Sequence, residues 1–123
     1  MKLLLIGIGG FLGAIARYGL SGLLSRETFP MGTLAVNVLG CLVMGNLMGL
    51  VLERQLFSPE TRLLWLTGFL GAFTTFSTFG FETFVLLRDE STRLLALVSV
   101  AANVVLGLGA VVFGWFLARW TGV

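Results

Sequence analysis

Hydrophobic residues run along this chain in four long stretches separated by short polar segments. Three stretches carry no charged residue, namely residues 32–52, 63–81 and 94–118. A fourth, residues 3–24, is interrupted once, by Arg17. Because a helix needs about 20 apolar residues to cross a bilayer, each stretch predicts one transmembrane helix.

Three short connectors, residues 25–30, 53–62 and 88–93, join these stretches. In the second connector, Ser58-Pro59-Glu60 is a helix start signal, because Ser caps a helix and Pro fits its first turn. We therefore predict an all-α membrane protein with four transmembrane helices, in which residues 1–123 form a single domain.

Composition supports a lipid environment. Hydrophobic residues make up 57% of the 123 residues and charged residues 11%, against about 25% charged in soluble domains. So short a chain cannot bury that much apolar surface by itself. Histidine is absent and Cys41 is the only cysteine, which excludes a disulfide framework and the usual zinc sites. The net charge of +2 is too small for nucleic-acid binding.

The basic residues divide almost evenly between the two predicted membrane faces. One face has Lys2, Arg54, Arg62 and Arg119, and the other has Arg26, Arg88 and Arg93, with Arg17 added if it extends that way. Without a Lys and Arg bias, the chain has no preferred orientation and can pair as an antiparallel homodimer. Alternatively, the count is too small to matter and other determinants set one orientation. Charge alone leaves both interpretations open.

Small residues recur four positions apart in three of the stretches. The pairs are Gly9 with Gly13, Gly45 with Gly49, and Ala110 with Gly114. Such pairs let helix backbones approach closely in lipid. We interpret them as helix contacts, without a chemical role.

The third stretch contains the most informative segment, residues 71–82. Four hydroxyl residues occupy five positions there: Thr74, Thr75, Ser77 and Thr78. Because Ser and Thr side chains compete for backbone hydrogen bonds, a helix break is predicted between residues 74 and 77. A break inside a bilayer must be buried in protein or line a wet cavity, and it exposes carbonyls on one side and N–H groups on the other. The alternative is a continuous helix whose hydroxyls bond back to the preceding turn.

Phenylalanine is concentrated in the same region, with six of the eleven between residues 69 and 84. Phe76 and Phe79 are three positions apart and share one helix face. A Phe stripe ordinarily packs a core. The positive edge of an aromatic ring can also face an anion in a narrow, dry pore, and neighbouring hydroxyl groups can donate hydrogen bonds to it.

Other polar residues lie inside the predicted spans. Thr33 and Asn37 are one turn apart, and Asn46 and Asn103 are further intramembrane amides. Each Asn marks either a permeation pathway or a hydrogen bond between helices. Arg17 and Glu82 are the only charges well inside apolar sequence. Each either faces a water-filled vestibule or extends to the membrane interface.

Together these features resemble the Fluc (CrcB-type) fluoride channels over nearly the whole chain. Three ordered motifs carry the resemblance: residues 9–14 (GGFLGA) leading to Arg17-Tyr18, residues 32–37 (GTLAVN) with Gly40, and residues 71–82 (GAFTTFSTFGFE). The resemblance implies a dual-topology antiparallel homodimer with two fluoride pores. It also implies a structural sodium ion at the dimer centre, held by backbone carbonyls of the third-helix break.

The resemblance further implies roles for individual residues. Gly71 and Thr74 supply the sodium carbonyls, Phe76 and Phe79 are the pore rings, Asn37 is the pore amide, Thr33, Ser77 and Thr78 form a polar track, and Glu82 and Arg17 are vestibule residues. Family members often place Tyr, His or Ser of the fourth helix toward the pore. This chain has Ser99 and Asn103 there, and their contribution remains open.

The predicted function is that of a passive fluoride-selective channel, not an enzyme, which exports cytoplasmic fluoride. Its expected location is the cell inner membrane or plasma membrane, as a multi-pass protein, with fluoride, a second copy and lipid as partners and no nucleic acid. The alternative is a small dual-topology drug/proton antiporter, which needs a membrane-embedded carboxylate. The first stretch has none, and Glu82 lies near a predicted helix end. A non-transporting assembly subunit is a third interpretation, which leaves the helix break unexplained.

Overall fold

The computed structural model describes residues 1–121, and within them all regular structure is helical. The elements in chain order are α1 (Lys2–Leu24), α2 (Met31–Arg54), α3 (Pro59–Arg62), the π-helical η1 (Leu63–Leu70), α4 (Gly71–Phe73), α5 (Phe76–Arg88), the 3₁₀ turn η2 (Glu90–Thr92) and α6 (Arg93–Trp120). They form four segments long and apolar enough to cross a membrane: Lys2–Leu24, Met31–Arg54, Pro59–Arg88 and Glu90–Trp120. The predicted all-α class and the four spans are confirmed.

Local sequence explains where the third span begins. Helix α2 ends at Arg54, and Gln55 turns the chain with φ of 52°. Pro59 then opens α3, and the Ser58 hydroxyl accepts a hydrogen bond from the Thr61 N–H at 3.2 Å. The predicted start signal therefore works as a helix N-cap. The π-helical geometry of η1 that follows was not predicted from the sequence.

Glycines bring α1 into backbone contact with the first half of the third span. A Cβ added at Gly9 would collide with the Leu64 carbonyl, and one added at Gly13 would collide with the Phe69 carbonyl. Gly68 meets α1 from the other side, since its own Cβ would lie 2.8 Å from the Ile6 carbonyl oxygen. Both predicted glycines of this pair are therefore confirmed as helix contacts.

Helices α2 and α6 form the other close pair. Gly45 faces the Val111 carbonyl and Gly114 faces the Leu42 carbonyl, so neither position has room for a side chain. Nearby, Asn46 Nδ2 donates to the Gly114 carbonyl at 3.3 Å. Asn46 is thus a tether between helices, which was one of its two predicted roles.

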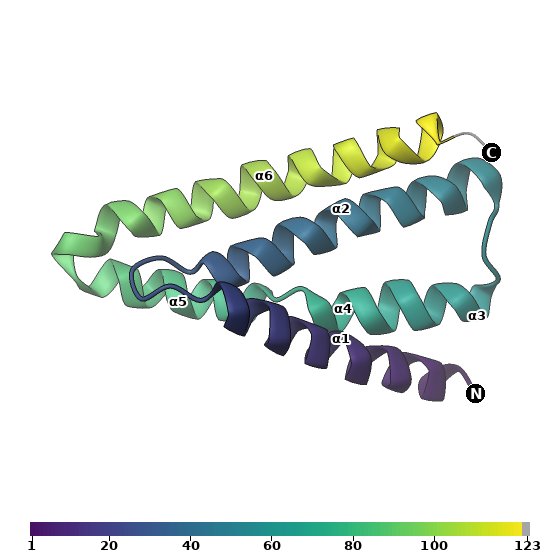
Figure 1. Cartoon of the computed structure of the whole chain (residues 1–123), viewed down its shortest axis with the longest axis horizontal. Coiled ribbons are helices and arrows are strands. Elements are labelled where there is room, and N and C mark those ends of the chain that lie inside the picture. Colours follow the sequence, from purple (N-terminus) through teal and green to yellow (C-terminus); the bar gives the residue numbers. More distant parts are fainter. Residues whose placement is uncertain (122–123) are drawn as a thin grey trace.

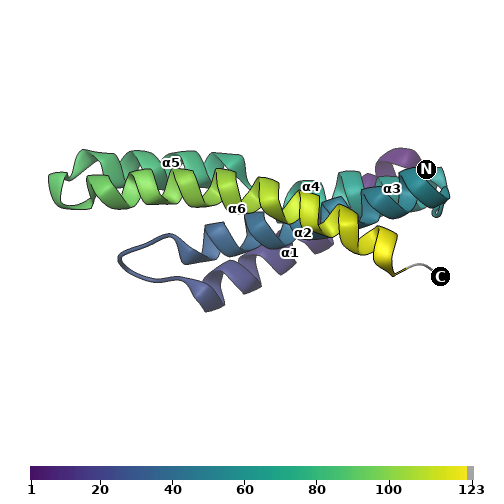
Figure 2. The ribbon, with the colours of Figure 1, turned by 90° about the horizontal axis from the view of Figure 1, so that it is seen from above.

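The four spans alternate in direction, so the two chain termini lie at the same end of the bundle (Figure 1). The α2–α3 connector lies at that end too, while the α1–α2 connector and η2 lie at the opposite end, as Figure 2 also shows. This arrangement separates Lys2, Arg54, Arg62 and Arg119 from Arg26, Arg88 and Arg93. The predicted near-balance of charge between the two ends is therefore a property of the folded chain.

The buried core is small and lies beside the helix break. Val36, Leu70 and Phe73 form it, with Leu70 only 2% exposed. Most other large apolar side chains point outward from α1, α5 and α6. Since water does not tolerate so much exposed apolar surface, lipid or protein must cover these faces.

Candidate functional site

The third span is interrupted near its middle by two extended residues. Helix α4 ends at Phe73, Thr74 has ψ of 156°, Thr75 has φ of −148°, and α5 begins at Phe76. The predicted break between residues 74 and 77 is confirmed. Its location matches the cluster of hydroxyl residues.

Side-chain hydrogen bonds replace the missing helical ones at the break. The Thr75 hydroxyl accepts from the Thr78 N–H at 3.2 Å and so caps α5. The Thr75 N–H, which a continuous helix would direct to the Gly71 carbonyl, donates instead to Asn37 Oδ1 at 2.8 Å. Thr74 does bond back to the preceding turn, through its hydroxyl to the Leu70 carbonyl at 3.1 Å. That single bond does not keep the helix continuous.

Helix α2 contacts the break through Gly40 and Asn37. Gly40 lies directly beneath the Thr74 methyl group, where a Cβ would collide. Asn37 lies almost one turn earlier and contacts Thr75 twice, since its Nδ2 also donates to the Thr75 carbonyl at 3.2 Å. Gly40 and Asn37 belong to one sequence motif. In the structure both contact the break, Gly40 at Thr74 and Asn37 at Thr75.

Arg17 extends from α1 to the break. Its guanidinium donates to the Thr74 carbonyl at 3.4 Å. The side chain therefore lies at the middle of the bundle, away from both membrane ends. This contact places a positive charge next to one of the two carbonyls assigned to sodium by resemblance.

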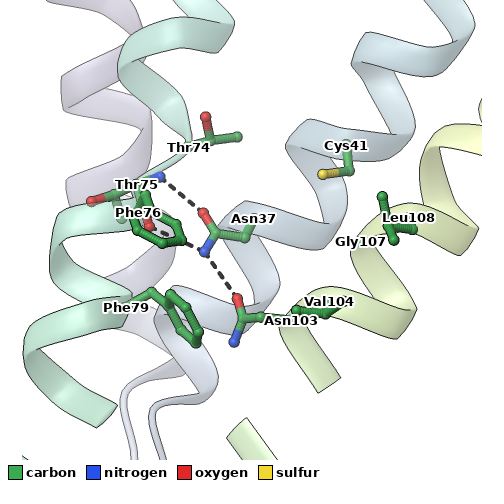
Figure 3. A pocket seen from close by; sticks show the side chains of 10 residues that line it. All are labelled: Asn37, Cys41, Thr74, Thr75, Phe76, Phe79, Asn103, Val104, Gly107 and Leu108. Carbon is green, nitrogen blue, oxygen red and sulfur yellow. Dashed lines mark hydrogen bonds between the residues drawn. The ribbon is translucent and has the colours of Figure 1, made fainter. Parts of the chain in front are cut away.

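A pocket of about 340 Å³ opens beside the break (Figure 3). It is lined by Asn37, Cys41, Thr74, Thr75, Phe76, Phe79, Asn103, Val104, Gly107 and Leu108. The rings of Phe76 and Phe79 stand 5.5 Å apart between centroids, inclined at 55°. Phe76 is 83% exposed, because the described chain covers the pocket on one side only.

The remaining predicted site residues lie at different distances from this pocket. Ser77 and Thr78 are exposed in the first turn of α5 and do not line it, although the Thr75 hydroxyl bonds to that of Thr78 at 3.0 Å. Thr33 is only 5% exposed and lies outside it, and Gly71 is exposed at the start of α4. The structure thus gathers Asn37, Phe76 and Phe79 and leaves these four residues outside the lining.

Glu82 lines a second pocket, of about 260 Å³, between the α1–α2 connector and α5. Arg26 and Glu27 contribute from the connector. One Glu82 oxygen, Oε2, is buried without a hydrogen-bond partner among the described residues. Arg17 does not line this pocket, so the two predicted vestibule residues lie apart.

The fourth span contributes through Asn103, whose role the sequence left open. Asn103 Oδ1 accepts from Asn37 Nδ2 at 3.0 Å, and Asn103 Nδ2 donates to the Ser99 carbonyl at 3.0 Å. Ser99 itself is completely buried and offers its backbone, not its side chain, to this contact. Cys41 was not selected from the sequence, although its position one turn after Asn37 places it on the same helix face.

The pocket lining suits a small anion that has lost its water. No acidic or basic side chain lines it within the described residues. Amide and hydroxyl groups can donate hydrogen bonds, and aromatic edges present partial positive charge. The absence of acids in the described lining removes like-charge repulsion, which is expensive in a low dielectric.

Comparison with known proteins finds a family and relatives that match most of the chain. Residues 4–115 match the family model described as CrcB-like protein, Camphor Resistance (CrcB). A relative from Methylobacillus flagellatus, named fluoride-specific ion channel FluC, is 42% identical over 98% of this chain and 96% of its own length.

Two archaeal relatives are similar to the chain at comparable levels. A fluoride-specific ion channel FluC 1 from Methanosarcina acetivorans is 49% identical over 91% of this chain and 86% of its own. A fluoride-specific ion channel FluC from Pyrococcus abyssi is 48% identical over 94% of each chain. The family match over residues 4–115 therefore includes the residues that form the break and line the pocket.

Proposed function

Since the chain belongs to the CrcB-like protein family, we propose that it is a passive, fluoride-selective ion channel of the membrane. It is a transport protein and not an enzyme. The observation that carries the proposal is the pocket at the helix break, where two phenylalanine rings and an amide network meet without an acidic or basic side chain in the described lining.

Fluoride is small and strongly hydrated, so a pore must replace the water that the ion sheds. Phe76 and Phe79 offer ring edges, which attract an anion without presenting a full charge that would trap it. Hydroxyl and amide donors beside the rings supply hydrogen bonds of the kind that water provided. We assign Thr33, Ser77 and Thr78 to the polar track that leads to and from this pocket.

Passive flow is sufficient for export. Outside the cell, acid converts fluoride to HF, which crosses the bilayer and ionises again at neutral internal pH. A negative-inside potential then drives the anion out through an open pore. The relatives' printed function does not support the antiporter, and the pocket lacks the carboxylate that proton exchange would need within its described lining.

The proposed working unit is an antiparallel homodimer with two pores. One side of the pocket is uncovered, Phe76 is 83% exposed, and Ser77 and Thr78 are exposed beside it. A second copy would cover these residues, whereas lipid offers no hydrogen-bond partners for their polar groups. Near-equal basic charge at the two ends is compatible with insertion in both orientations.

The break also supplies ligands suited to a sodium ion between the two copies. The Gly71 carbonyl loses its helical donor because the Thr75 N–H bonds to Asn37, and the Thr74 carbonyl ends the first half of the span. Unwound backbone carbonyls are typical sodium ligands in membrane proteins. The long 3.4 Å contact from Arg17 leaves the second lone pair of the Thr74 oxygen available. Bound there, sodium would be shared by carbonyl groups of the two breaks and would hold the two copies together through its positive charge.

We place the protein in the cell inner membrane or plasma membrane, where fluoride export is useful. Vestibule roles are proposed for Glu82, in the second pocket, and for Arg17, beside the break. Lipid covers the apolar outer faces of α1 and α6.

The test is anion efflux from liposomes that contain the purified protein. With valinomycin present to balance charge, we expect rapid fluoride release, followed by a fluoride electrode, and little chloride release under the same gradient. Protein-free liposomes give the baseline. Equal release of both anions, or release at the baseline rate, would contradict the proposed function.

A further inference from the structure

The second pocket lies where the α1–α2 connector faces α5, at the end of the bundle opposite the two termini (Figure 1). Its volume is about 260 Å³. Three of its lining residues are charged: Arg26 and Glu27 from the connector, and Glu82 from α5. The others are mainly apolar, namely Thr28, Phe29, Pro30, Phe81, Val85 and Leu86. The pocket therefore combines charges of both signs with an apolar wall.

The three charged side chains have no partner in the part of the chain that the structure describes. Within residues 1–121, Arg26, Glu27 and Glu82 form neither a hydrogen bond nor an ion pair through their side chains. Arg26 and Glu27 are exposed, so water can serve them, but Glu82 is only partly exposed and its Oε2 is buried. A carboxylate in such surroundings loses hydration without a replacement, which is unfavourable. The pocket thus leaves Glu82 and Arg26 unpaired although both line it.

The position of the pocket along α5 corresponds to the surface of a bilayer. Glu82 lies about 9 Å from the end of α5 at Arg88, given the rise of an α-helix. The headgroup layer on each side of the hydrocarbon is about 5 to 7 Å thick. Beside Glu82, Phe81 is 68% exposed and Val85 is 48% exposed. Charged and apolar groups of the pocket therefore meet near the level where lipid headgroups join their acyl chains.

We propose that this pocket binds the zwitterionic headgroup of an aminophospholipid of the phosphatidylethanolamine type. The primary ammonium group of such a lipid would donate hydrogen bonds to the Glu82 carboxylate. Its phosphate would accept from the Arg26 guanidinium, whose planar fork matches phosphate oxygens. The acyl chains would then run along the exposed Phe81 and Val85 side chains. One ligand thereby pairs both charges that the protein leaves unpaired.

Related phospholipids lack one part of this match. Phosphatidylcholine carries the same two charges, but its quaternary ammonium group has no N–H donor. Phosphatidylglycerol has the phosphate and no ammonium group, so the Glu82 carboxylate would repel it. The proposal adds a lipid ligand to the vestibule role of Glu82 and does not depend on which ion the channel carries.

A lipid series tests the proposal on the unaltered protein. The purified full chain in detergent is mixed with equal amounts of palmitoyl-oleoyl phosphatidylethanolamine, phosphatidylcholine and phosphatidylglycerol, and the bound lipid is identified by native mass spectrometry. Because hydrogen bonds to charged groups are strong, we expect phosphatidylethanolamine to bind about tenfold more tightly than either competitor. Equal binding of phosphatidylethanolamine and phosphatidylcholine would overturn the proposal. A preference for phosphatidylglycerol would also overturn it, since the site would then select an anion.

Matched variants locate the binding. Glu82→Gln should abolish the preference for phosphatidylethanolamine over phosphatidylglycerol, and Arg26→Gln should weaken the binding of all three lipids. Glu90→Gln and Arg93→Gln are the controls, because these residues pair with each other at the same end of the bundle and lie outside the pocket. Both controls should keep the original preference. If Glu82→Gln keeps it too, the lipid binds elsewhere and the assignment is wrong.

The outcomes separate this proposal from the proposed channel function, because lipid binding is measured without fluoride. A phosphatidylethanolamine preference that depends on Glu82 supports the lipid site even if the liposomes release no fluoride. Selective fluoride release without that preference leaves the channel function standing and makes the lipid assignment wrong. Gel filtration checks that each variant assembles, and the lipid series on the unaltered protein decides the question if a variant does not.

Discussion

Phe76 and Phe79 lie in different surroundings from Phe73, and the pore role proposed for the two residues rests on that difference. Phe73, three positions before Phe76, is 8% exposed and belongs to the core with Val36 and Leu70. Phe76 is 83% exposed and lines the pocket together with Phe79. The two kinds of Phe are separated by the break, because the extended residues 74 and 75 change which face of the helix points inward.

Replacing Phe76 or Phe79 by Ile tests the contribution of the rings. Ile remains bulky and apolar but lacks the ring quadrupole, so a partner for the anion is lost while packing is largely kept. We expect fluoride efflux to fall about tenfold or more in each variant, with unchanged assembly on gel filtration. Normal efflux in both variants would return these residues to a packing role. Trp65→Ile is a suitable control, since Trp65 is aromatic and lies outside the pocket.

At the scale of the elements, glycine contacts fix how the first half of the third span packs against its neighbours. Gly9 and Gly13 allow α1 to pack closely against η1, and Gly40 allows Thr74 to pack closely against α2. These contacts hold both ends of the first half of the third span. The pocket residues are consequently positioned by backbone packing as well as by their own hydrogen bonds.

Gly13→Ala should disturb this packing. The new methyl group would collide with the Phe69 carbonyl, a backbone atom that cannot rotate away. Overpacking of this kind costs about 1 to 3 kcal/mol, so a lower midpoint of thermal unfolding in detergent is expected, together with slower fluoride efflux. Gly7→Ala is the matched control, because nothing in the described structure lies within 4 Å of its added Cβ. An unchanged midpoint in Gly13→Ala would contradict the close contact between α1 and η1.

At the scale of the whole molecule, an even number of spans places both termini at one end, and the basic residues divide between the ends. In the proposed homodimer, a second copy would cover the exposed side of the pocket. Topology and function are connected in this proposal, because a two-fold axis that lies in the membrane plane relates copies inserted in opposite orientations.

Charge-biased variants test that connection. Two or three lysines added at the amino terminus and in the 53–62 connector should set one orientation, and lysines added in the 25–30 and 88–93 connectors should set the other. We expect neither variant alone to protect a fluoride-sensitive cell. Coexpression of the two should restore protection.

Orientation in this experiment is read by labelling cysteines introduced into the connectors, in a Cys41→Ser background that has first been shown to conduct. Full protection by one variant whose single orientation has been confirmed would eliminate the dual-topology homodimer. It would leave the pocket assignment intact, since the pocket is formed within one chain.

The sequence by itself determined the four spans, their connectors and the location of the break. Each of these depends on local properties: the length of an apolar stretch, the capping by Ser58 with Pro59, and the run of hydroxyl residues from 74 to 78. Family membership followed from the same motifs, which the comparison confirms over residues 4–115. These features are predictable because neighbouring residues in the chain are sufficient to produce them.

Only the tertiary structure decided how the polar groups are paired. Asn37, Thr75 and Asn103 come from three different spans, and the sequence offered each Asn either a pathway or a tether. Asn46 is a tether between helices, Asn37 bonds to the break at Thr75, and Asn103 donates to the Ser99 carbonyl, with no second acceptor among the described residues. Hydrogen-bond direction depends on which donor faces which acceptor across helices, and residue spacing along one helix does not contain that information. Thr33 lies one turn from Asn37 and yet outside the pocket, because spacing along one helix does not determine which neighbouring helix a side chain faces.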